Sequence, residues 1–320
     1  MKLKTFSVFL GIVTISYIYP AKAQSTEGFP QVSENKQILQ VQNRVNEKQQ
    51  MTLIDRKLFF GDPEISGAQL SPDGNFLAFR KPLNGVINIW VKGINEPMNA
   101  ARPVTEDKNR PIPAYFWSQD SKYILFVQDK GGNENFRIYA VSPTDKVAKG
   151  QIPEAKDLTP EDKVQARIYA VPENKPNTII VGLNDSDPKF HDVYSINIAT
   201  GERKLLYKND SNVSNWVADL EGNLQLAVIN LSDGSTQINR IEGDSFKEVY
   251  RCQFGETCLP IRFHKNGQQV YMATNKGEDV DLSRLTLFNP QTQEIELIDS
   301  DPEKQVDFGS PIFSEETEEL

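Results

Sequence analysis

Short apolar runs separated by polar turns recur along the chain, and the pattern is clearest in the stretch Gln69–Arg80. The segment 71–74 (SPDG) favours a tight turn, because Pro fixes φ, Asp bonds nearby backbone groups and Gly tolerates positive φ. Apolar, β-favouring runs of strand length follow at Phe76–Phe79 and Ile89–Val91. The stretch therefore predicts a unit of strand, turn, strand, loop and strand.

This unit is repeated along the rest of the chain, with a degenerate third copy. Successive copies begin 45 to 54 residues apart, when they are aligned on the position of Ser71. The residues at that position are Ser71, Ser118, Pro172, Asp219, His264 and Ser314. A period of this length with about four short strands is typical of β-propeller blades, which bury their faces only by stacking on neighbours. The pattern predicts an all-β fold over residues 60–320, a β-propeller incomplete at about five blades plus the start of a sixth.

The first 23 residues have the pattern of a secretory signal peptide. Two lysines precede an apolar run over residues 6–18, and the small residues Ala21 and Ala23 suit cleavage after Ala23. A membrane anchor that stays attached is the alternative. Cleavage would remove three lysines and no acidic residue, which takes the formal net charge from −9 to −12. No later apolar stretch is long enough to cross a bilayer, so we expect a secreted or periplasmic protein with no membrane span after cleavage.

Residues 24–59 are expected to hold a polar segment followed by an amphipathic helix. Apolar residues recur at roughly helical spacing from Lys36 to Phe60, with polar residues between them. The helix, whole or broken in two, precedes the first blade.

The charge balance and the two cysteines narrow the choice of partners and ligands. An acidic chain argues against a nucleic-acid partner, which requires clustered Lys and Arg. Cys252 and Cys258 have five residues between them, including Gly255, so they either form a disulfide across a hairpin loop or remain free thiols. Zinc is disfavoured because no second pair of Cys or His residues is near them in the sequence.

Three stretches together resemble one known family. They are DPEISGAQLSPDGNFLAFR from Asp62, the following NIWV, and above all QDKGGNENFRIYAV at Gln128–Val141. They resemble the amino-terminal half of secreted serine peptidases of the prolyl oligopeptidase family, nearest to the dipeptidyl aminopeptidases and acylaminoacyl peptidases. The resemblance implies a propeller of seven or eight blades that restricts peptide access to a following α/β-hydrolase domain with a Ser-Asp-His triad. It also implies that the amino-terminal helix packs on that hydrolase domain.

The chemistry of such a hydrolase is not found in these 320 residues. A nucleophile on a G-x-S-x-G turn is absent, and Ser235 falls in a predicted hairpin. His191 is predicted in a loop and His264 in a turn. The acidic loop around His191 lacks the Gly and terminal Glu of a calcium loop. We therefore assign no catalytic, cofactor-binding or metal-binding residue, and we expect the isolated chain to be inactive.

Glu134, in the motif that carries the resemblance, has two interpretations. It either contacts the amino group of a peptide substrate, or it shares with Asn135 a structural role in a blade turn. The resulting hypothesis is the propeller portion of an exported serine peptidase, gating peptide access to a hydrolase domain outside this chain. The alternative is a stand-alone binding propeller of the cell envelope without catalysis. No residue set points to an enzyme working at the propeller's own channel, and the sequence does not predict the oligomeric state.

Overall fold

The computed structural model describes residues 54–61, 63–145, 147–148, 150–314 and 317–320. The predicted signal peptide, the polar segment and most of the predicted amphipathic helix lie outside these residues. Ile65–Leu320 belongs to one compact unit, and the described residues before Ile65 belong to a second.

The described end of the predicted amphipathic helix is helical. Helix α2 spans Arg56–Phe60, and the side chain of Asp55 caps it by accepting a hydrogen bond of 2.9 Å from the Lys57 N–H. Leu58, Phe59 and Phe60 are all exposed.

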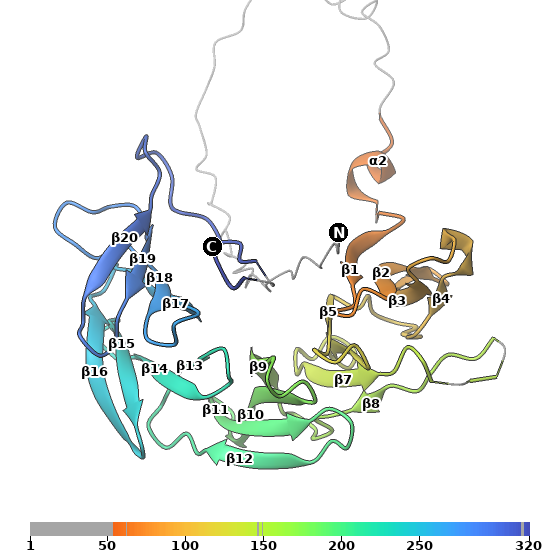
Figure 1. The fold of residues 1–320 in the computed structure, drawn as a ribbon, viewed down its shortest axis with the longest axis horizontal. Helices are drawn as coiled ribbons and strands as arrows, with labels where there is room; N and C mark the ends of the chain where they lie inside the picture. Colours follow the sequence, from red (N-terminus) through yellow and green to blue (C-terminus); the bar gives the residue numbers. More distant parts are fainter. Residues whose placement is uncertain (1–53, 62, 146, 149, 315–316) are drawn as a thin grey trace, which may run out of the picture. The chain divides into compact units, whose positions relative to one another are not determined.

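The rest of the chain forms five antiparallel sheets of four strands each, in which sequence neighbours pair in order. The first three sheets comprise β1 (Ser66–Leu70), β2 (Phe76–Leu83), β3 (Val86–Gly93) and β4 (Arg102–Pro103); β5 (Ala114–Trp117), β6 (Ile124–Gln128), β7 (Arg137–Val141) and β8 (Lys156–Asp157); and β9 (Ala166–Ala170), β10 (Thr178–Asp187), β11 (Phe190–Asn197) and β12 (Arg203–Tyr207). The last two comprise β13 (Asn215–Ala218), β14 (Leu224–Asn230), β15 (Thr236–Glu242) and β16 (Ser245–Cys252); and β17 (Cys258–Phe263), β18 (Val270–Thr274), β19 (Arg284–Phe288) and β20 (Ile295–Asp299). A short 3₁₀ helix, η1 (Met98–Ala100), lies between β3 and β4. The predicted β-propeller with five blades is therefore confirmed, and Figure 1 shows the sheets following one another in chain order.

The turn that defines the repeat has the same backbone hydrogen bond in four of its six copies. In each, an N–H at the aligned position donates to the carbonyl five residues later: Ser71 to Phe76, Ser118 to Tyr123, His264 to Gln269 and Ser314 to Glu319, at 2.8–2.9 Å. Pro172 has no N–H to donate, so the degenerate third copy is closed by the Lys175 N–H on the Pro172 carbonyl at 3.3 Å. The sequence alignment of the blades therefore coincides with one physical turn.

The core is built between consecutive sheets. Four separate apolar clusters join the first sheet to the second, the second to the third, the third to the fourth and the fourth to the fifth. Ile89, Ile138, Trp216 and Phe288 represent them, and each is at most 2% exposed. Each of the three inner blades thus has both faces covered by its neighbours, as the repeat predicted.

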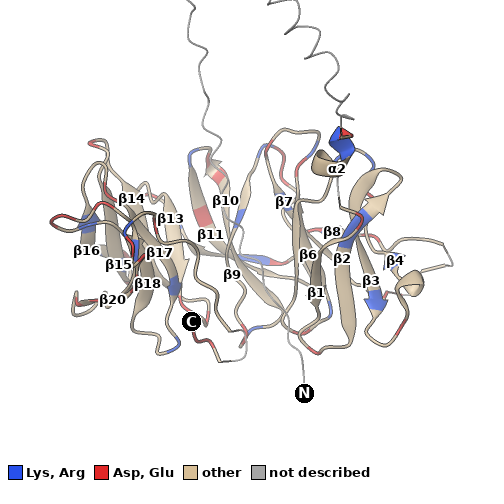
Figure 2. Cartoon of the chain, turned by 90° about the horizontal axis from the view of Figure 1, so that it is seen from above, with Lys and Arg blue, Asp and Glu red and all other residues tan. Residues whose placement is uncertain are grey.

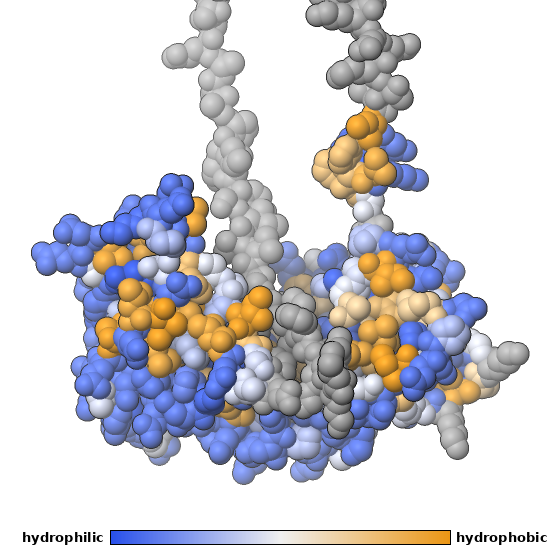
Figure 3. Space-filling model, turned by 45° about the horizontal axis from the view of Figure 1, so that its top comes forward, coloured by the Kyte–Doolittle hydropathy of each residue, from blue (hydrophilic) through white to orange (hydrophobic). Residues whose placement is uncertain are grey.

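The end sheets differ from the inner ones. None of the five clusters found among the described residues contains residues of both the fifth sheet and the first. The fifth sheet instead packs on the carboxyl-terminal segment, where the Phe313 ring lies 5.0 Å from that of Tyr271. No strand is formed in the described residues after Asp299, so of the sixth copy only the turn is present. Figure 3 shows apolar surface over both end sheets. Ile65, which directly precedes β1, and Leu259 in β17 are exposed.

A disulfide joins the fourth and fifth sheets. Cys252 ends β16, Cys258 begins β17, and their Cα atoms lie 5.9 Å apart. Both cysteines belong to the apolar cluster between these two sheets, and Cys252 is fully buried. Of the two alternatives that the sequence left open, the structure has the bridge.

Replacing both cysteines by Ala is expected to lower the free energy of unfolding by about 2 kcal/mol, because the unfolded chain regains the entropy of a short closed loop. Urea unfolding followed by tryptophan fluorescence measures the change. The control is dithiothreitol, which should destabilise the native chain by a similar amount and leave the double variant unaffected. Equal midpoints for the two chains would contradict the assignment of this bridge to stability.

Candidate functional site

The connections after the second and fourth strand of each sheet all lie at one end of the strands, because neighbouring strands are antiparallel. We call this end the loop face. It consists of residues 84–85, 104–113, 129–136, 158–165, 188–189, 208–214, 231–235, 253–257, 275–283 and 300–308. Bonds between adjacent connections confirm the arrangement: the Thr257 N–H donates to Asn275 Oδ1 at 2.6 Å, and the Ser283 N–H donates to Asp307 Oδ1 at 2.7 Å.

The loop face is rich in acidic residues. Its connections carry more Asp and Glu than Lys and Arg, and Figure 2 shows the charged residues along them. Such a face favours cationic groups over anions at long range.

The β6–β7 hairpin, residues 129–136, presents Glu134 at this face. Glu134 has a φ of +60°, an unusual conformation for a residue with a side chain. Its N–H donates to Asp129 Oδ2 at 3.1 Å, and its carbonyl accepts from Gln165 Nε2 at 3.2 Å. Its carboxylate is exposed, and no partner for it is found in the part of the chain that the structure describes. The backbone of Glu134 is thus fixed at both ends while its charge stays free.

An ion pair with one buried partner anchors this hairpin. The side chain of Asp129 is fully buried, and it lies 3.0 Å from Nε of Arg110, which comes from the connection between β4 and β5. Gly132 makes room for this arginine, since a Cβ at that position would lie 2.6 Å from Arg110 Nη1. Arg110 lies in the connection between the first and second sheets, and Gln165 lies in the connection between the second and third, so the connections on both sides of the second sheet hold this hairpin.

A second ion-pair group lies at the base of the same hairpin. Arg137 in β7 is 6% exposed at its side chain and contacts Asp157 at 3.0 Å and Asp162 at 2.5 Å. Asp157 belongs to β8, and Asp162 belongs to the connection that leads to β9. Two of the four charged residues of the 128–141 motif, Asp129 and Arg137, are therefore structural, whereas Lys130 and Glu134 are exposed.

The backbone and the carboxylate of Glu134 lie in different environments, and only the structural interpretation is tested by contacts within the chain. Its backbone has a structural role, and the Asn135 N–H completes the turn by donating to Asn133 Oδ1 at 3.0 Å. The free carboxylate is suited to meet an ammonium group. The partners Arg110 and Gln165 were missed by sequence reasoning, and no local signal marks them, because they lie 19 or more residues from Asp129 or Glu134 along the chain.

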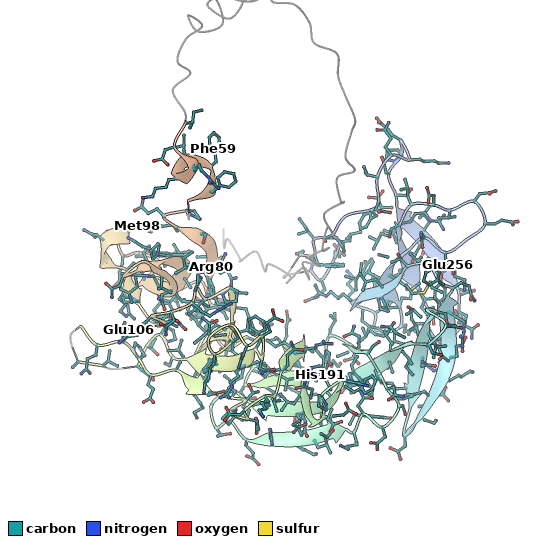
Figure 4. All side chains as sticks on the ribbon, turned by 180° about the vertical axis from the view of Figure 1, so that it is seen from behind. Phe59, Arg80, Met98, Glu106, His191 and Glu256 are labelled. Atoms are coloured by element: carbon teal, nitrogen blue, oxygen red, sulfur yellow. A yellow bond between two sulfur atoms is a disulfide. The ribbon has the colours of Figure 1, made fainter. Side chains whose placement is uncertain are left out.

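The prediction that His191 lies in a loop was wrong. His191 is the second residue of β11, because the strands of this hairpin run on to a turn of two residues. Burial, and after it the positive charge of Arg167, lower the pKa of His191 to about 4. Its carbonyl accepts from Asn209 Nδ2 and Trp216 Nε1, both at 3.2 Å, whereas its Nε2 has no hydrogen-bond partner within the described residues. Figure 4 labels His191 in the third sheet.

The described residues do not assemble a nucleophilic triad. Ser235 lies in the β14–β15 turn and its hydroxyl donates to Asp233 Oδ1 at 2.6 Å. The two histidines lie in different sheets, and His264 stands at the repeat turn, as predicted. Within the described ranges, no group of three or more Cys, His, Asp and Glu side chains could hold a metal ion. None of the described helices has the length and apolar character needed to span a bilayer.

Comparison with known proteins identifies relatives of the chain. A scan against models of protein families finds no match. Dipeptidyl aminopeptidase BIII of Pseudoxanthomonas mexicana is 40% identical over 230 residues, which are 71% of this chain and 32% of that protein. Dipeptidyl peptidase family member 6 of Caenorhabditis elegans is 28% identical over 267 residues, 76% of this chain and 34% of that protein.

A solved prolyl endopeptidase structure supports the fold. It matches with a TM-score of 0.51 at 14% identity, over 73% of this chain and 35% of its own. The chain spans about a third of the length of the curated relatives that it matches. It belongs to the prolyl oligopeptidase family of peptidases, beside the dipeptidyl aminopeptidases, and its five sheets correspond to the amino-terminal β-propeller part of that family.

Proposed function

We propose that this chain is the propeller portion of an exported serine peptidase and that it gates the access of peptides to a hydrolase domain. The observation that carries the proposal is the 40% identity over 230 residues to a dipeptidyl aminopeptidase. The peptidase chemistry belongs to the hydrolase domain, and this chain contributes the surface that peptides pass and contact.

The loop face is the part of the propeller suited to that role. A peptide with a free amino terminus carries an ammonium group, which an acidic face attracts. Glu134 offers an exposed carboxylate on a backbone that is fixed by Asp129 and Gln165. A charge held in place by its own backbone loses little entropy when it binds a ligand. We therefore place the contact with the substrate's amino group at Glu134.

Two features support export. The sequence pattern of residues 1–23 fits a cleaved signal peptide. The Cys252–Cys258 bridge is of the kind that persists in oxidising compartments. A secreted or periplasmic location is consistent with both.

The amino-terminal helix is proposed to pack on the hydrolase domain. Leu58, Phe59 and Phe60 of α2 are 78%, 65% and 79% exposed, and adjacent exposed side chains of this size favour an apolar partner.

The experiment uses the enzyme encoded by the complete reading frame. A chromogenic dipeptidyl amide with a free amino terminus should be hydrolysed, and the enzyme should react with a fluorophosphonate probe for activated serines. An enzyme that hydrolyses no peptide amide and takes up no probe would favour the stand-alone binding propeller instead.

In that enzyme, Glu134→Gln is expected to raise KM for the free-amine substrate about tenfold, because a charged hydrogen bond to the ammonium group is lost. Hydrolysis of the same substrate acetylated at its amino group should not change. Glu278→Gln is the matched control, since Glu278 is an exposed acid on the same face. An equal effect of both substitutions would show that only the overall charge of the face acts.

A further inference from the structure

A hollow of about 490 Å³ opens at the loop face between the first and second sheets. Its apolar side is formed by Ile112, Phe126, Tyr139, Ile152 and Pro153. The rings of Phe126 and Tyr139 are stacked with centroids 5.2 Å apart; Phe126 is 6% exposed, so the partly exposed Tyr139 ring is the aromatic group that this side offers. Ligand pockets commonly have this size and combine an apolar surface with a few polar groups.

Two carboxylates at the hollow already have partners within the chain. Asp107 Oδ1 accepts from the N–H groups of Asn109 and Arg110, both at 2.8 Å, and its Oδ2 accepts from Gln128 Nε2 at 3.1 Å. Asp129 Oδ2 accepts from the Glu134 N–H, and its buried Oδ1 lies 3.0 Å from Arg110 Nε as an ion pair, without a hydrogen-bond partner among the described residues. Both acids thus already face groups of this chain.

The two cationic side chains at the hollow still have nitrogens without an acceptor in the described part of the chain. Arg110 pairs with Asp129 through Nε, its side chain is 46% exposed, and its terminal nitrogens have no acceptor in the described part of the chain. Lys130 is exposed and also has no partner among the described residues. Glu106, labelled in Figure 4, is the one remaining acid here, and its nearest cation is Lys108 at 3.9 Å. Unused donors beside an aromatic surface favour an anion with an apolar body.

We propose that this hollow binds a small organic carboxylate with an aromatic or branched apolar body, of the size of an acylated amino acid. The guanidinium of Arg110 would take the carboxylate through its two terminal nitrogens, with Lys130 as the second charge. The apolar body would lie on the Tyr139 ring. The site is separate from the Glu134 carboxylate and does not depend on the function proposed above.

Binding has a consequence for the hairpin. Arg110 holds Asp129, and Asp129 holds the Glu134 amide. A carboxylate that orders Arg110 therefore stabilises this chain of contacts, and the Glu134 amide should exchange its hydrogen more slowly when the ligand is bound.

The test titrates the 320-residue chain with N-acetylphenylalanine in a calorimeter, and a dissociation constant of about 1 mM is expected for a ligand of this size. The corresponding amide, which lacks the charge, and acetate, which lacks the apolar body, should bind at least tenfold more weakly. The bound carboxylate could belong to a free aromatic acid or to an acylated amino acid or peptide end, and 3-phenylpropionate distinguishes the two. If 3-phenylpropionate binds as tightly as N-acetylphenylalanine, the site recognises a free aromatic acid. If it binds more weakly, the site recognises the acylated amino acid or the end of a peptide.

Substitutions locate the site without disturbing the buried pair. Lys130→Gln should weaken binding about threefold, and Glu106→Gln should strengthen it, since one removes attraction and the other removes repulsion. Lys189→Gln, which removes an exposed lysine elsewhere on the loop face, should leave the affinity unchanged. The proposal is overturned if the amide binds as well as the acid, if no binding is seen at 10-fold the expected constant, or if Lys130→Gln and Lys189→Gln behave alike.

Discussion

Arg110→Ala is expected to lower the free energy of unfolding by about 3 kcal/mol, which is a large share of the stability of a typical domain. The reason is the carboxylate that it leaves behind: the side chain of Asp129 is fully buried, and Arg110 supplies its charge partner. An unpaired buried charge costs far more than the net gain from the pair itself. Urea unfolding at neutral pH, followed by tryptophan fluorescence, measures the loss.

Adding Asp129→Asn to Arg110→Ala should recover part of the stability, because a neutral amide oxygen still accepts the Glu134 N–H without the cost of the charge. The matched control is Arg203→Ala. Arg203 pairs with Glu161 at 2.6 Å, but the two side chains are 36% and 31% exposed, so the loss there should stay below about 1 kcal/mol. If Arg203→Ala lowers the free energy of unfolding as much as Arg110→Ala does, the burial of Asp129 is not the reason for the loss.

Stability is also expected to fall steeply on the acid side because of His191. Its pKa is lowered to about 4 in the folded chain, and the ordinary value is 6.5. Between pH 6.5 and pH 4, His191 is therefore protonated in the unfolded chain but remains neutral in the folded chain. This part of the stability is fully present above pH 6.5 and is lost as the pH falls towards 4, by about 2 kcal/mol between pH 7 and pH 5.

The groups around His191 give the direction of this effect. Arg167 in β9 opposes the protonated ring, whereas Asp192, which is paired with Lys208 at 3.0 Å, and the backbone of Gln165 favour it. Burial lowers the pKa of His191 by more than Asp192 and the Gln165 backbone raise it. His191→Gln should remove the dependence between pH 7 and pH 5, measured by urea unfolding at several pH values. His264→Gln, which retains His191, should keep it. A native chain with equal stability at pH 7 and pH 5 would contradict this account of His191.

The blades could be predicted from sequence because they are local. Within each copy, the turn and the apolar runs that follow it are close in sequence, as in the first copy, where Ser71 and Val91 are 20 residues apart. The hydrogen bond from the Ser71 N–H to the Phe76 carbonyl recurs at Ser118, His264 and Ser314, where the alignment had placed it. Even the weak third copy at Pro172 was found, because its strands keep the apolar pattern although its turn lacks one donor.

The candidate site could be predicted only in part. Glu134 was singled out through the motif in which it lies, but what fixes it was not foreseen. Arg110 and Gln165 reach the hairpin from the connections before and after its sheet, and such contacts depend on how the chain packs rather than on any period along the chain. His191 was misplaced for a related reason: the polar run 184–192 reads as a loop, whereas β10 and β11 extend through it as a paired hairpin. Polar residues in an extended hairpin have no apolar alternation to reveal them.

The central claim, that this propeller belongs to a serine peptidase, is tested most directly by the coding sequence that follows the codon for Leu320. We predict an open frame that continues through more blades into a segment with a G-x-S-x-G turn, followed by an Asp and then a His. Further blades followed by a stop codon, with no such segment, would contradict the claim and leave a binding propeller without chemistry.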